Sequence, residues 1–283
     1  FYKYTHCEID PTLIFGIVAS VIPLIERNQA PRVLFYCAQA KQGIGIYATN
    51  FENRLDTMGH VLYYPQCPLV STNNSNYINF NELPSGQNVI VAIASHTGYN
   101  QEDSIIINQS SLDRGLFVSS YFRTYFAKEQ KNSSTLEEEK FCKPQKYNPN
   151  GTIRTNLMKQ GASYDKLEEN GFVKEGTRVN DGDVIIGKCI PLKTTSDDDA
   201  KYRDASTSVK PNESGIVDKV YIDKDGEGFK FAKVRVRTER IPQIGDKYAC
   251  YTPDHDVLTT DGWIPINEIT TDHKVASLVD GKR

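Results

Sequence analysis

At 283 residues the chain is long enough to bury a sizeable core and to form more than one domain. Its composition, 39% hydrophobic and 24% charged, is ordinary for a globular protein, and no apolar run reaches the roughly 18 residues of a membrane span. The net charge of −3 excludes a chain that is basic throughout, so any nucleic-acid-binding surface must be local.

Two helices are predicted near the start of the chain. Asp10 and Pro11, followed by the largely apolar residues 12–20, predict a helix with an N-cap and a first-turn proline, which Pro23 ends. Residues 28–32 (Asn-Gln-Ala-Pro-Arg) repeat this start signal, and residues 33–42 predict a second helix that stops before the next glycines.

The next segments predict a loop and a strand. Residues 71–76 are polar and predict a loop. Residues 89–94 are apolar and β-branched, which predicts a buried strand. No internal repeat or coiled-coil heptad is found in the chain.

The character of the sequence changes after residue 117. Residues 128–150 are polar and mixed in charge, which predicts a surface excursion. Residues 179–187 and 215–222 predict short strands, and residues 225–228 (Asp-Gly-Glu-Gly) predict a hairpin turn into the clearest strand, 232–238.

In this last strand apolar and basic residues alternate. Ala232, Val234 and Val236 share one face, and Lys233, Arg235 and Arg237 share the other. The basic face is either a solvated sheet surface or a wall beside a phosphate backbone, and the alternation alone does not decide between them.

Six cysteines are scattered along the chain without a CxxC pair, so neither a zinc site nor a dense disulfide framework is expected. Five of them predict reduced, half-buried thiols of a cytoplasmic or nuclear protein. They are Cys7, Cys37, Cys67, Cys142 and Cys189; Cys250 is treated separately below.

Several charged residues are candidates for phosphate and metal chemistry. Glu102 and Asp103 form an adjacent carboxylate pair after the predicted strand 89–94, where such a pair can hold a divalent cation. Arg32, in the first turn of its helix, has the geometry to grip a phosphate in bidentate fashion. Lys247 follows a tight Gly-Asp turn. Taken singly, each of these is better explained as a solvated surface charge.

Eleven short segments occur together in an order that is specific for one family. They are residues 5–9, 28–32, 40–42, 56–58, 62–66, 83–87, 98–103, 108–111, 113–115, 203–206 and 241–247. With these segments the chain resembles the second-largest, β-like subunit of multisubunit DNA-directed RNA polymerases, of the polymerase II type or its large-DNA-virus relatives. The resemblance covers residues 1–249.

The resemblance implies an α+β, β-rich multidomain fragment. Residues 1–118 resemble the first part of the hybrid-binding region, which lies beside the RNA–DNA heteroduplex. Residues 119–240 resemble the inserted, β-rich wall, and residues 241–249 resemble the resumed hybrid-binding region.

The same resemblance assigns roles to the candidates. Glu102 and Asp103 are implied to approach the second magnesium ion, which the nucleotide brings. Arg32 is implied to contact the incoming triphosphate, with Gln29 in the same segment, and Lys247 is implied to lie close to the RNA 3′ end.

The implied activity is nucleotidyl transfer from ribonucleoside triphosphates to the RNA 3′ end. The resemblance implies that this transfer needs Mg²⁺ held mainly by the nucleotide and by the largest subunit, whose Asp-x-Asp-x-Asp loop has no counterpart in this chain. The implied partners are the largest and other polymerase subunits, template DNA and the RNA–DNA hybrid, and no membrane. The implied location is the nucleus, or a cytoplasmic virus factory if the source is viral.

The chain departs from the family at Cys250, where a Ser-Arg-His-Gly sequence is expected after Ala249. Residues 250–283 resemble the start of an intein, an all-β Hint domain. Strands are predicted at 257–260, toward 269 and at 275–279, with a turn at Asp261 and Gly262.

In this reading Cys250 is the splicing nucleophile and Ala249–Cys250 is the scissile bond. The Cys250 thiol attacks the Ala249 carbonyl and converts the peptide bond into a thioester. The later intein elements that splicing requires are absent from residues 250–283.

Three functional hypotheses remain open at this point. The first is part of the catalytic core of an RNA polymerase, caught as an intein-containing precursor fragment. The second is an autoprocessing Hint precursor with the upstream residues as cargo. The third is a nucleic-acid-binding scaffold without activity of its own.

A chain that opens without Met and ends at Arg283 after a turn-like Asp280-Gly281 is expected to be a fragment of something longer.

Overall fold

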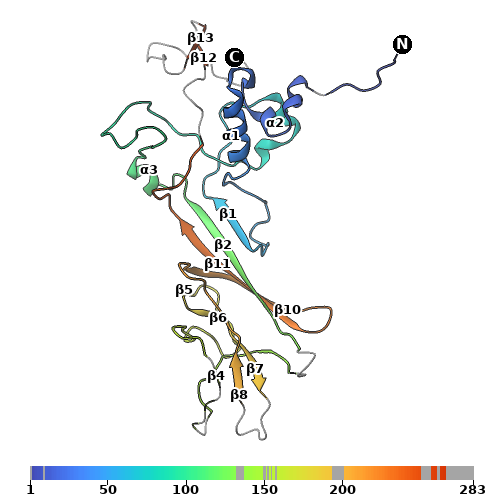
Figure 1. Cartoon of the computed structure of the whole chain (residues 1–283), viewed down its shortest axis with the longest axis vertical. Helices are drawn as coiled ribbons and strands as arrows, with labels where there is room; N and C mark the ends of the chain where they lie inside the picture. Colours follow the sequence, from blue (N-terminus) through green and yellow to red (C-terminus); the bar gives the residue numbers. More distant parts are fainter. Residues whose placement is uncertain are drawn as a thin grey trace. The chain divides into compact units, whose positions relative to one another are not determined.

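The computed structural model describes residues 2–8, 10–131, 137–148, 151, 153, 155–156, 158–192, 201–249, 256–259 and 262–265 (Figure 1). The chain divides into two compact units. Unit 1 comprises Phe1–Ile46, Leu62–Val118 and Ile241–Arg283, and unit 2 comprises Tyr47–Val61 and Ser119–Arg240. The units divide after residues 118 and 240, and residues 47–61 belong to unit 2. The assignment of the segments to a hybrid-binding region and a wall stays a prediction.

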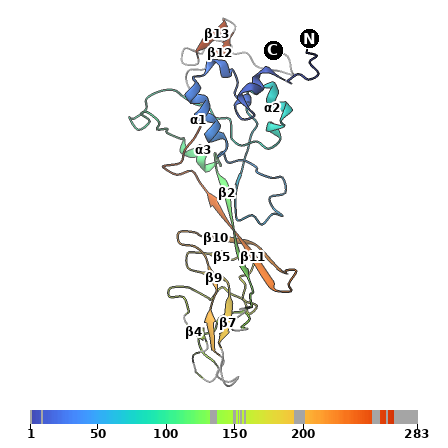
Figure 2. The same cartoon turned by 45° about the vertical axis from the view of Figure 1, so that its right-hand side comes forward.

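Unit 2 is built on a five-stranded sheet in the order β1-β2-β11-β10-β5. Its long strands β2, β11 and β10 lie side by side in Figures 1 and 2, with β11 antiparallel to both neighbours. The strands are β1 (Met58–Leu62), β2 (Ser119–Lys128), β5 (Arg178–Val179), β10 (Gly215–Lys224) and β11 (Lys230–Arg240). The predicted hairpin turn joins β10 to β11, where the Asp225 amide donates to the Phe229 carbonyl at 2.9 Å.

Smaller sheets complete unit 2. One has the order β3-β7-β8-β4 and another pairs β6 with β9. The strands are β3 (Lys140–Phe141), β4 (Thr155–Asn156), β6 (Val184–Ile186), β7 (Lys188–Leu192), β8 (Lys201–Asp204) and β9 (Thr207–Ser208). The predicted strand region 179–187 is therefore confirmed as two short strands, and the predicted polar excursion contains β3.

The main hydrophobic core lies in unit 2. Ala232, Val234 and Val236 on β11 are buried, as their alternation predicts, and they pack with the fully buried Val184, Ile185 and Ile186. Removing this apolar surface from water stabilises the sheet by about 25 cal/mol per Å².

The opposite face of β11 is not the uniformly basic surface that the sequence predicted. Lys233 is half-buried and Arg237 is exposed, but the Arg235 side chain is buried under residues 51–54. A backbone segment distant in sequence supplies carbonyl oxygens to its guanidinium, so this residue is unavailable to a phosphate backbone.

Unit 1 carries most of the helical structure. The second predicted helix is confirmed as α1 (Ala30–Ala40). The first predicted helix is wrong: residues 11–27 form three short 3₁₀ turns, Pro11–Phe15, Ala19–Val21 and Ile25–Arg27. Gly16 takes a left-handed φ of 83° and Pro23 lacks an amide donor, and these two features interrupt the helix.

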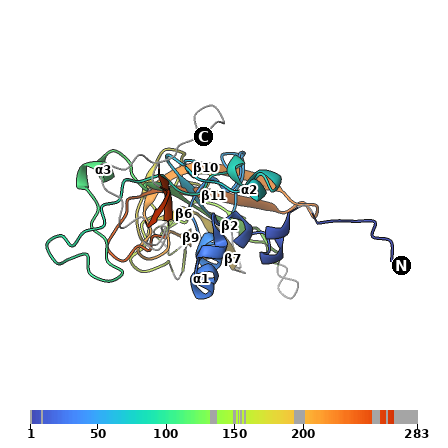
Figure 3. The same ribbon diagram turned by 90° about the horizontal axis from the view of Figure 1, so that it is seen from above.

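The remaining helices of unit 1 are short. Residues 71–76 were predicted as a loop, but Thr72 caps α2 (Asn73–Tyr77) by accepting from the Ser75 amide. A 3₁₀ turn, Phe80–Glu82, follows, and α3 (Gln109–Asp113) is capped by Asn108. Figure 3 shows α1 and α2 from above, with the exposed residues 2–8 leading away from them.

The predicted buried strand at 89–94 is wrong. These residues form no strand in the described part of the chain, and the Ile90 side chain is fully exposed. A strand is buried only where neighbours cover it, and the side chains of Gln87 and Asn88, rather than a strand ladder, bind the neighbouring segment 64–69.

The C-terminal residues contribute one described hairpin. Strand β12 (Asp256–Thr259) pairs antiparallel with β13 (Gly262–Pro265), which agrees with the strand predicted at 257–260, whereas Asp261 of the predicted turn lies outside the described residues. Cys250 and the predicted strand 275–279 lie outside the described residues, so the Hint domain stays a prediction.

The described residues agree with a mixed, sheet-rich fold that has few helices. The five described cysteines form no disulfide, with Cys7 and Cys67 exposed rather than half-buried and Cys189 buried. Within the described ranges, no helix has both the length and the apolar content of a membrane span.

Candidate functional site

The amino end of α1 presents Gln29 and Arg32 to solvent. Gln29 is the N-cap, and its carbonyl accepts from the Arg32 amide at 3.0 Å. Val33, Tyr36 and Cys37 anchor the helix against a buried cluster of residues 19–25. A helix amino terminus attracts anions through its free amides and dipole, so an exposed arginine there is suited to a phosphate ligand.

The carboxylate pair, Glu102 and Asp103, directly follows a loop that side-chain hydrogen bonds close. The Asn100 side chain donates to the Ala94 carbonyl at 2.6 Å and accepts from the His96 amide at 2.9 Å, which closes the loop. Glu102 lies beyond it with a left-handed φ of 54°, a conformation that costs a residue with a side chain about 1–3 kcal/mol. Glu102 and Asp103 are both exposed.

Lys247 follows the tight turn that the sequence predicted. The Gln243 amide donates to the Asp246 carboxylate at 3.0 Å, the Asp246 amide donates to the Gln243 carbonyl at 3.1 Å, and Gly245 has a φ of 102°. The next residue, Tyr248, packs its ring 4.9 Å from that of Phe117. This contact holds the 241–249 segment against the end of the 62–118 segment in unit 1, while the Lys247 side chain remains exposed.

The predicted site residues all belong to unit 1, although they come from three separate stretches of sequence. They are Gln29, Arg32, Glu102, Asp103, Lys247 and Ala249. Among the residues that the structure describes, no hydrogen bond or ion pair joins their side chains to one another. Arg32, Glu102, Asp103 and Lys247 are exposed, so their charges are available to a ligand.

The carboxylate pair fits a partial magnesium site. Oxygen ligands from one or two carboxylates, completed by water and substrate phosphates, are what Mg²⁺ prefers. Within the described ranges no three His, Cys, Asp or Glu side chains come together as a metal site. Glu102 and Asp103 would therefore hold the ion only together with ligands from elsewhere.

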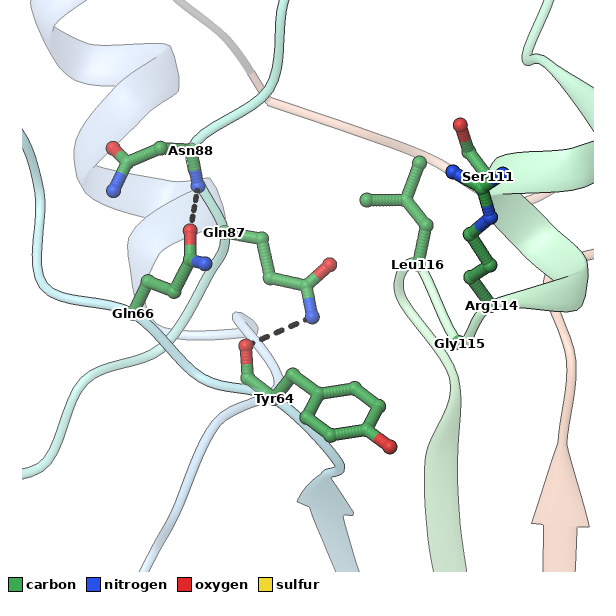
Figure 4. A pocket seen from close by; sticks show the side chains of 8 residues that line it. All are labelled: Tyr64, Gln66, Gln87, Asn88, Ser111, Arg114, Gly115 and Leu116. Atoms are coloured by element: carbon green, nitrogen blue, oxygen red, sulfur yellow. Dashed lines mark hydrogen bonds between the residues drawn. The ribbon is translucent and has the colours of Figure 1, made fainter.

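A pocket that the sequence did not predict lies in the same unit. Its volume is about 240 Å³, and Figure 4 shows it between two groups of side chains. The lining residues are Tyr64, Gln66, Gln87, Asn88, Ser111, Arg114, Gly115 and Leu116. All of them lie within or directly beside the motifs at 62–66, 83–87, 108–111 and 113–115. These motifs supported the resemblance, but no role was assigned to them.

Gln87 is the central structural residue of this pocket. Its amide nitrogen donates to the Tyr64 carbonyl at 2.9 Å (Figure 4), and its amide oxygen accepts from the Phe117 amide at 2.9 Å. Phe117 has a left-handed φ of 55° and also packs against Tyr248. One glutamine thus connects three stretches of unit 1, a role that the motif alone did not indicate.

The buried polar groups of unit 2 are structural. The Tyr125 hydroxyl donates to the Glu213 carboxylate, which also lies 3.3 Å from Arg123. Burial first, and then this hydrogen bond, raises the pKa of Tyr125 well above its ordinary value. Burial and a hydrogen bond to Asp204 likewise raise the pKa of Tyr164. Both phenols therefore stay neutral at physiological pH and act as hydrogen-bond donors.

Comparison with known proteins supplies the family. The model of the family described as RNA polymerase Rpb2, domain 6, matches residues 18–254. DNA-directed RNA polymerase II subunit RPB2 of Schizosaccharomyces pombe is 50% identical over 254 residues, covering 88% of this chain and 20% of the relative.

Archaeal and viral proteins are similar as well. DNA-directed RNA polymerase subunit Rpo2 of Sulfolobus acidocaldarius is 45% identical over 252 residues, covering 87% of this chain and 22% of the relative. DNA-directed RNA polymerase subunit 2 of Acanthamoeba polyphaga mimivirus is 40% identical over 250 residues, covering 88% of this chain and 20% of the relative. The chain spans about a fifth of the length of the curated relatives it matches.

Proposed function

The chain belongs to the family of second-largest DNA-directed RNA polymerase subunits, and from that membership we propose that it forms part of the polymerase catalytic core. The proposed reaction is the DNA-templated transfer of a nucleotide from a ribonucleoside triphosphate to the RNA 3′ end. The observation that carries the proposal is the 50% identity to a polymerase II subunit across 254 residues. The family match at residues 18–254 includes every proposed polymerase site residue.

The proposed roles follow from where the charges lie. Arg32, with Gln29 beside it at the amino end of α1, binds the incoming triphosphate, and Lys247 lies near the RNA 3′ end. Glu102 and Asp103 hold, with the nucleotide, a magnesium ion that stabilises charge on the departing pyrophosphate. Because phosphoryl transfer passes through charge-rich oxygens, the chain contributes positioning and opposing charge rather than a covalent step.

The proposal also includes partners and a location. The largest subunit supplies the first magnesium site, because the described part of this chain holds no three-ligand cluster. Template DNA and the RNA–DNA hybrid are the proposed nucleic-acid partners. Unit 2 is proposed to be the wall, against which the hybrid ends. The relatives include polymerase II subunits and a viral subunit, so the proposed location is the nucleus or a virus factory.

A chimeric subunit tests the polymerase proposal. Residues 1–249 replace the matching fifth of the Schizosaccharomyces pombe subunit, and the reconstituted polymerase is assayed for template-dependent RNA synthesis. We expect activity within about tenfold of the parent enzyme, since half of the residues are unchanged. The same chimera carrying Arg32→Ala is expected to need more nucleotide for half-maximal rate. An assembled chimera that binds RNA–DNA hybrid but makes no RNA would favour the scaffold hypothesis and contradict the catalytic one.

For residues 250–283 we propose the start of an intein. The family match stops at residue 254, close to the junction inferred at Cys250, and a two-stranded hairpin, β12 with β13, follows. In the proposed step the Cys250 sulfur bonds to the Ala249 carbonyl carbon while the C–N bond breaks. The Cys250 nitrogen leaves as an amine, so the product is an isomeric thioester.

Thiol-induced cleavage tests the intein proposal. When the chain is extended by the rest of its reading frame, added thiol is expected to release residues 1–249 as a discrete fragment. Cys250→Ala should abolish that fragment, whereas Cys189→Ala, which changes a buried thiol of unit 2, should leave it unchanged. Equal cleavage with Cys250→Ala would show that the thioester does not form at this residue.

A further inference from the structure

The face of the unit 2 sheet that points away from the core is covered over one part of its length. There Phe51 packs on Phe122 with ring centroids 6.1 Å apart. The Arg235 guanidinium donates to three carbonyls of the segment 51–54 and to the Asp218 carboxylate. This part of the face therefore combines an aromatic contact with a cation whose charge is paired.

Three aromatic rings from three neighbouring strands lie on the uncovered part of the same face. Lys233 of β11 pairs with Phe126 of β2 and with Tyr221 of β10, and directly opposed residues share a face. Phe231 shares it too, with its ring centroid 6.2 Å from Phe126 and 6.0 Å from Tyr221. The exposed fractions of Phe126 and Tyr221 are 57% and 43%. These four residues form the aromatic patch, which lies beside the β10–β11 hairpin that projects away from the smaller sheets in Figures 1 and 2.

Lys233 is the unpaired cation of this patch. Its side chain is half-buried, and in the part of the chain that the structure describes no hydrogen bond or ion pair reaches its ammonium group. A second lysine beside the patch, Lys128, lies 2.5 Å from the Asp225 carboxylate. Lys233 lies two residues from Arg235 on the same strand face but lacks the acceptors that pair the arginine. Covering such a cation costs free energy unless the covering group brings an anion.

The charges around the patch favour a single carboxylate over a chain of phosphates. Three carboxylates, Asp223, Asp225 and Glu227, lie at the adjoining hairpin with Lys128 and Lys233, so these five charges sum to −1. A polyanion binds by neutralising several phosphates, whereas only Lys233 is unpaired among the described residues here. The rings are also inclined to one another by 41° and 49°, so they present no common plane for stacked bases.

We propose that the aromatic patch is a docking site for a second protein, which places one aspartate or glutamate carboxylate on Lys233 and apolar side chains on the three rings. Aromatic residues are enriched at the centres of protein interfaces, and excluding water from around Lys233 strengthens its ion pair. The partner continues along the face the arrangement that the segment 51–54 and Asp218 make around Arg235. The patch belongs to unit 2, whereas every proposed polymerase site residue belongs to unit 1.

Peptide binding to the 283-residue chain tests this proposal. The probe is the capped heptapeptide Ser-Leu-Phe-Asp-Leu-Phe-Ser, and the control peptide has lysine in place of aspartate. Each peptide is titrated into the ¹⁵N-labelled chain, and the backbone signals of Tyr221 and Lys233 are followed. We expect the aspartate peptide to shift both signals and to bind at least tenfold more tightly than the lysine peptide. Equal affinity of the two peptides, or no shift at either residue, would overturn the proposal.

Four variants make the test specific. Lys233→Glu should lower the affinity for the aspartate peptide at least tenfold and raise that for the lysine peptide. Lys174→Glu makes the same change on an exposed lysine outside the patch and should leave both affinities unchanged. Phe126→Ser removes an exposed ring and should weaken binding of the aspartate peptide at least tenfold. Ile222→Ser changes an exposed apolar residue on the opposite face of β10 and should not.

The remaining outcomes are also decisive. Unchanged affinity in both Lys233→Glu and Phe126→Ser would show that the peptide binds elsewhere. An octathymidylate that shifts the same signals with equal affinity would assign the patch to nucleic acid and contradict the proposal. Loss of peptide binding in the assembled chimeric polymerase would show that the polymerase itself covers the patch, which also contradicts it. Because neither elongation nor thiol cleavage is measured, failure of this test leaves the polymerase and intein proposals standing.

Discussion

Replacing Glu102 and Asp103 together by alanine is expected to slow RNA elongation by roughly tenfold or more in the assembled polymerase. Both carboxylates are exposed, and no described residue neutralises them. The loop that presents them is closed by Asn100, and Glu102 is held at a φ of 54°. A costly backbone conformation under a charged, exposed side chain is typical of a functional site.

The measurement separates the loss of charge from the relief of backbone strain. Single-nucleotide addition is timed at increasing Mg²⁺, and the double variant should need more Mg²⁺ for half-maximal rate. Glu102→Gly removes the carboxylate while accommodating the left-handed φ, so it should be slow although its backbone is relaxed. Glu168→Ala with Glu169→Ala removes another exposed, adjacent acidic pair and should elongate normally. Elongation at an unchanged rate in the Glu102 and Asp103 variant would remove the proposed metal role.

Capping and turn residues in the sequence correctly predicted one helix and one hairpin, because interactions between residues close in sequence stabilise both. Helix α1 begins after Gln29 with Pro31 in its first turn, and the β10–β11 hairpin turns at Asp225 to Gly228, as capping and turn rules predict. The helix expected at 11–22 failed because Gly16 takes a positive φ, which the apolar pattern does not report. The apolar residues 89–94 met the criterion for a buried strand but have no strand partner among the described residues.

The candidate site residues come from sequence motifs and stay a prediction, whereas the contacts that support them are seen only in the structure. Arg32, Glu102, Asp103 and Lys247 were identified from motifs, and all four are exposed in unit 1. The supporting contacts, such as Gln87 to Phe117 and Phe117 to Tyr248, join residues 30 and more positions apart. No spacing rule connects such positions, so only the structure could reveal them.

Arg235 is the clearest case of a residue whose role depends on distant backbone. Its guanidinium donates to the carbonyls of Phe51 at 3.1 Å, Arg54 at 2.6 Å and Glu52 at 2.9 Å. It also donates to Asp218 at 2.7 Å and lies 4.9 Å above the Phe122 ring. With 5% of its surface exposed, it fixes the segment 47–61 to the sheet of unit 2.

Arg235→Met is therefore expected to destabilise unit 2 by about 3–5 kcal/mol, because Asp218 would lose its buried cation and three carbonyls would lose their donors. Equilibrium urea unfolding measures the loss, and hydrogen exchange at residues 51–54 locates it. Arg237→Met removes a neighbouring exposed arginine 3.7 Å from the same carboxylate and should cost no more than about 1 kcal/mol. Adding Asp218→Leu to Arg235→Met should restore part of the stability, since the unpaired charge is then gone. Equal losses in the two arginine variants would mean that the carbonyl contacts contribute nothing, and that residues 47–61 are held by the packing of Phe51 on Phe122 instead.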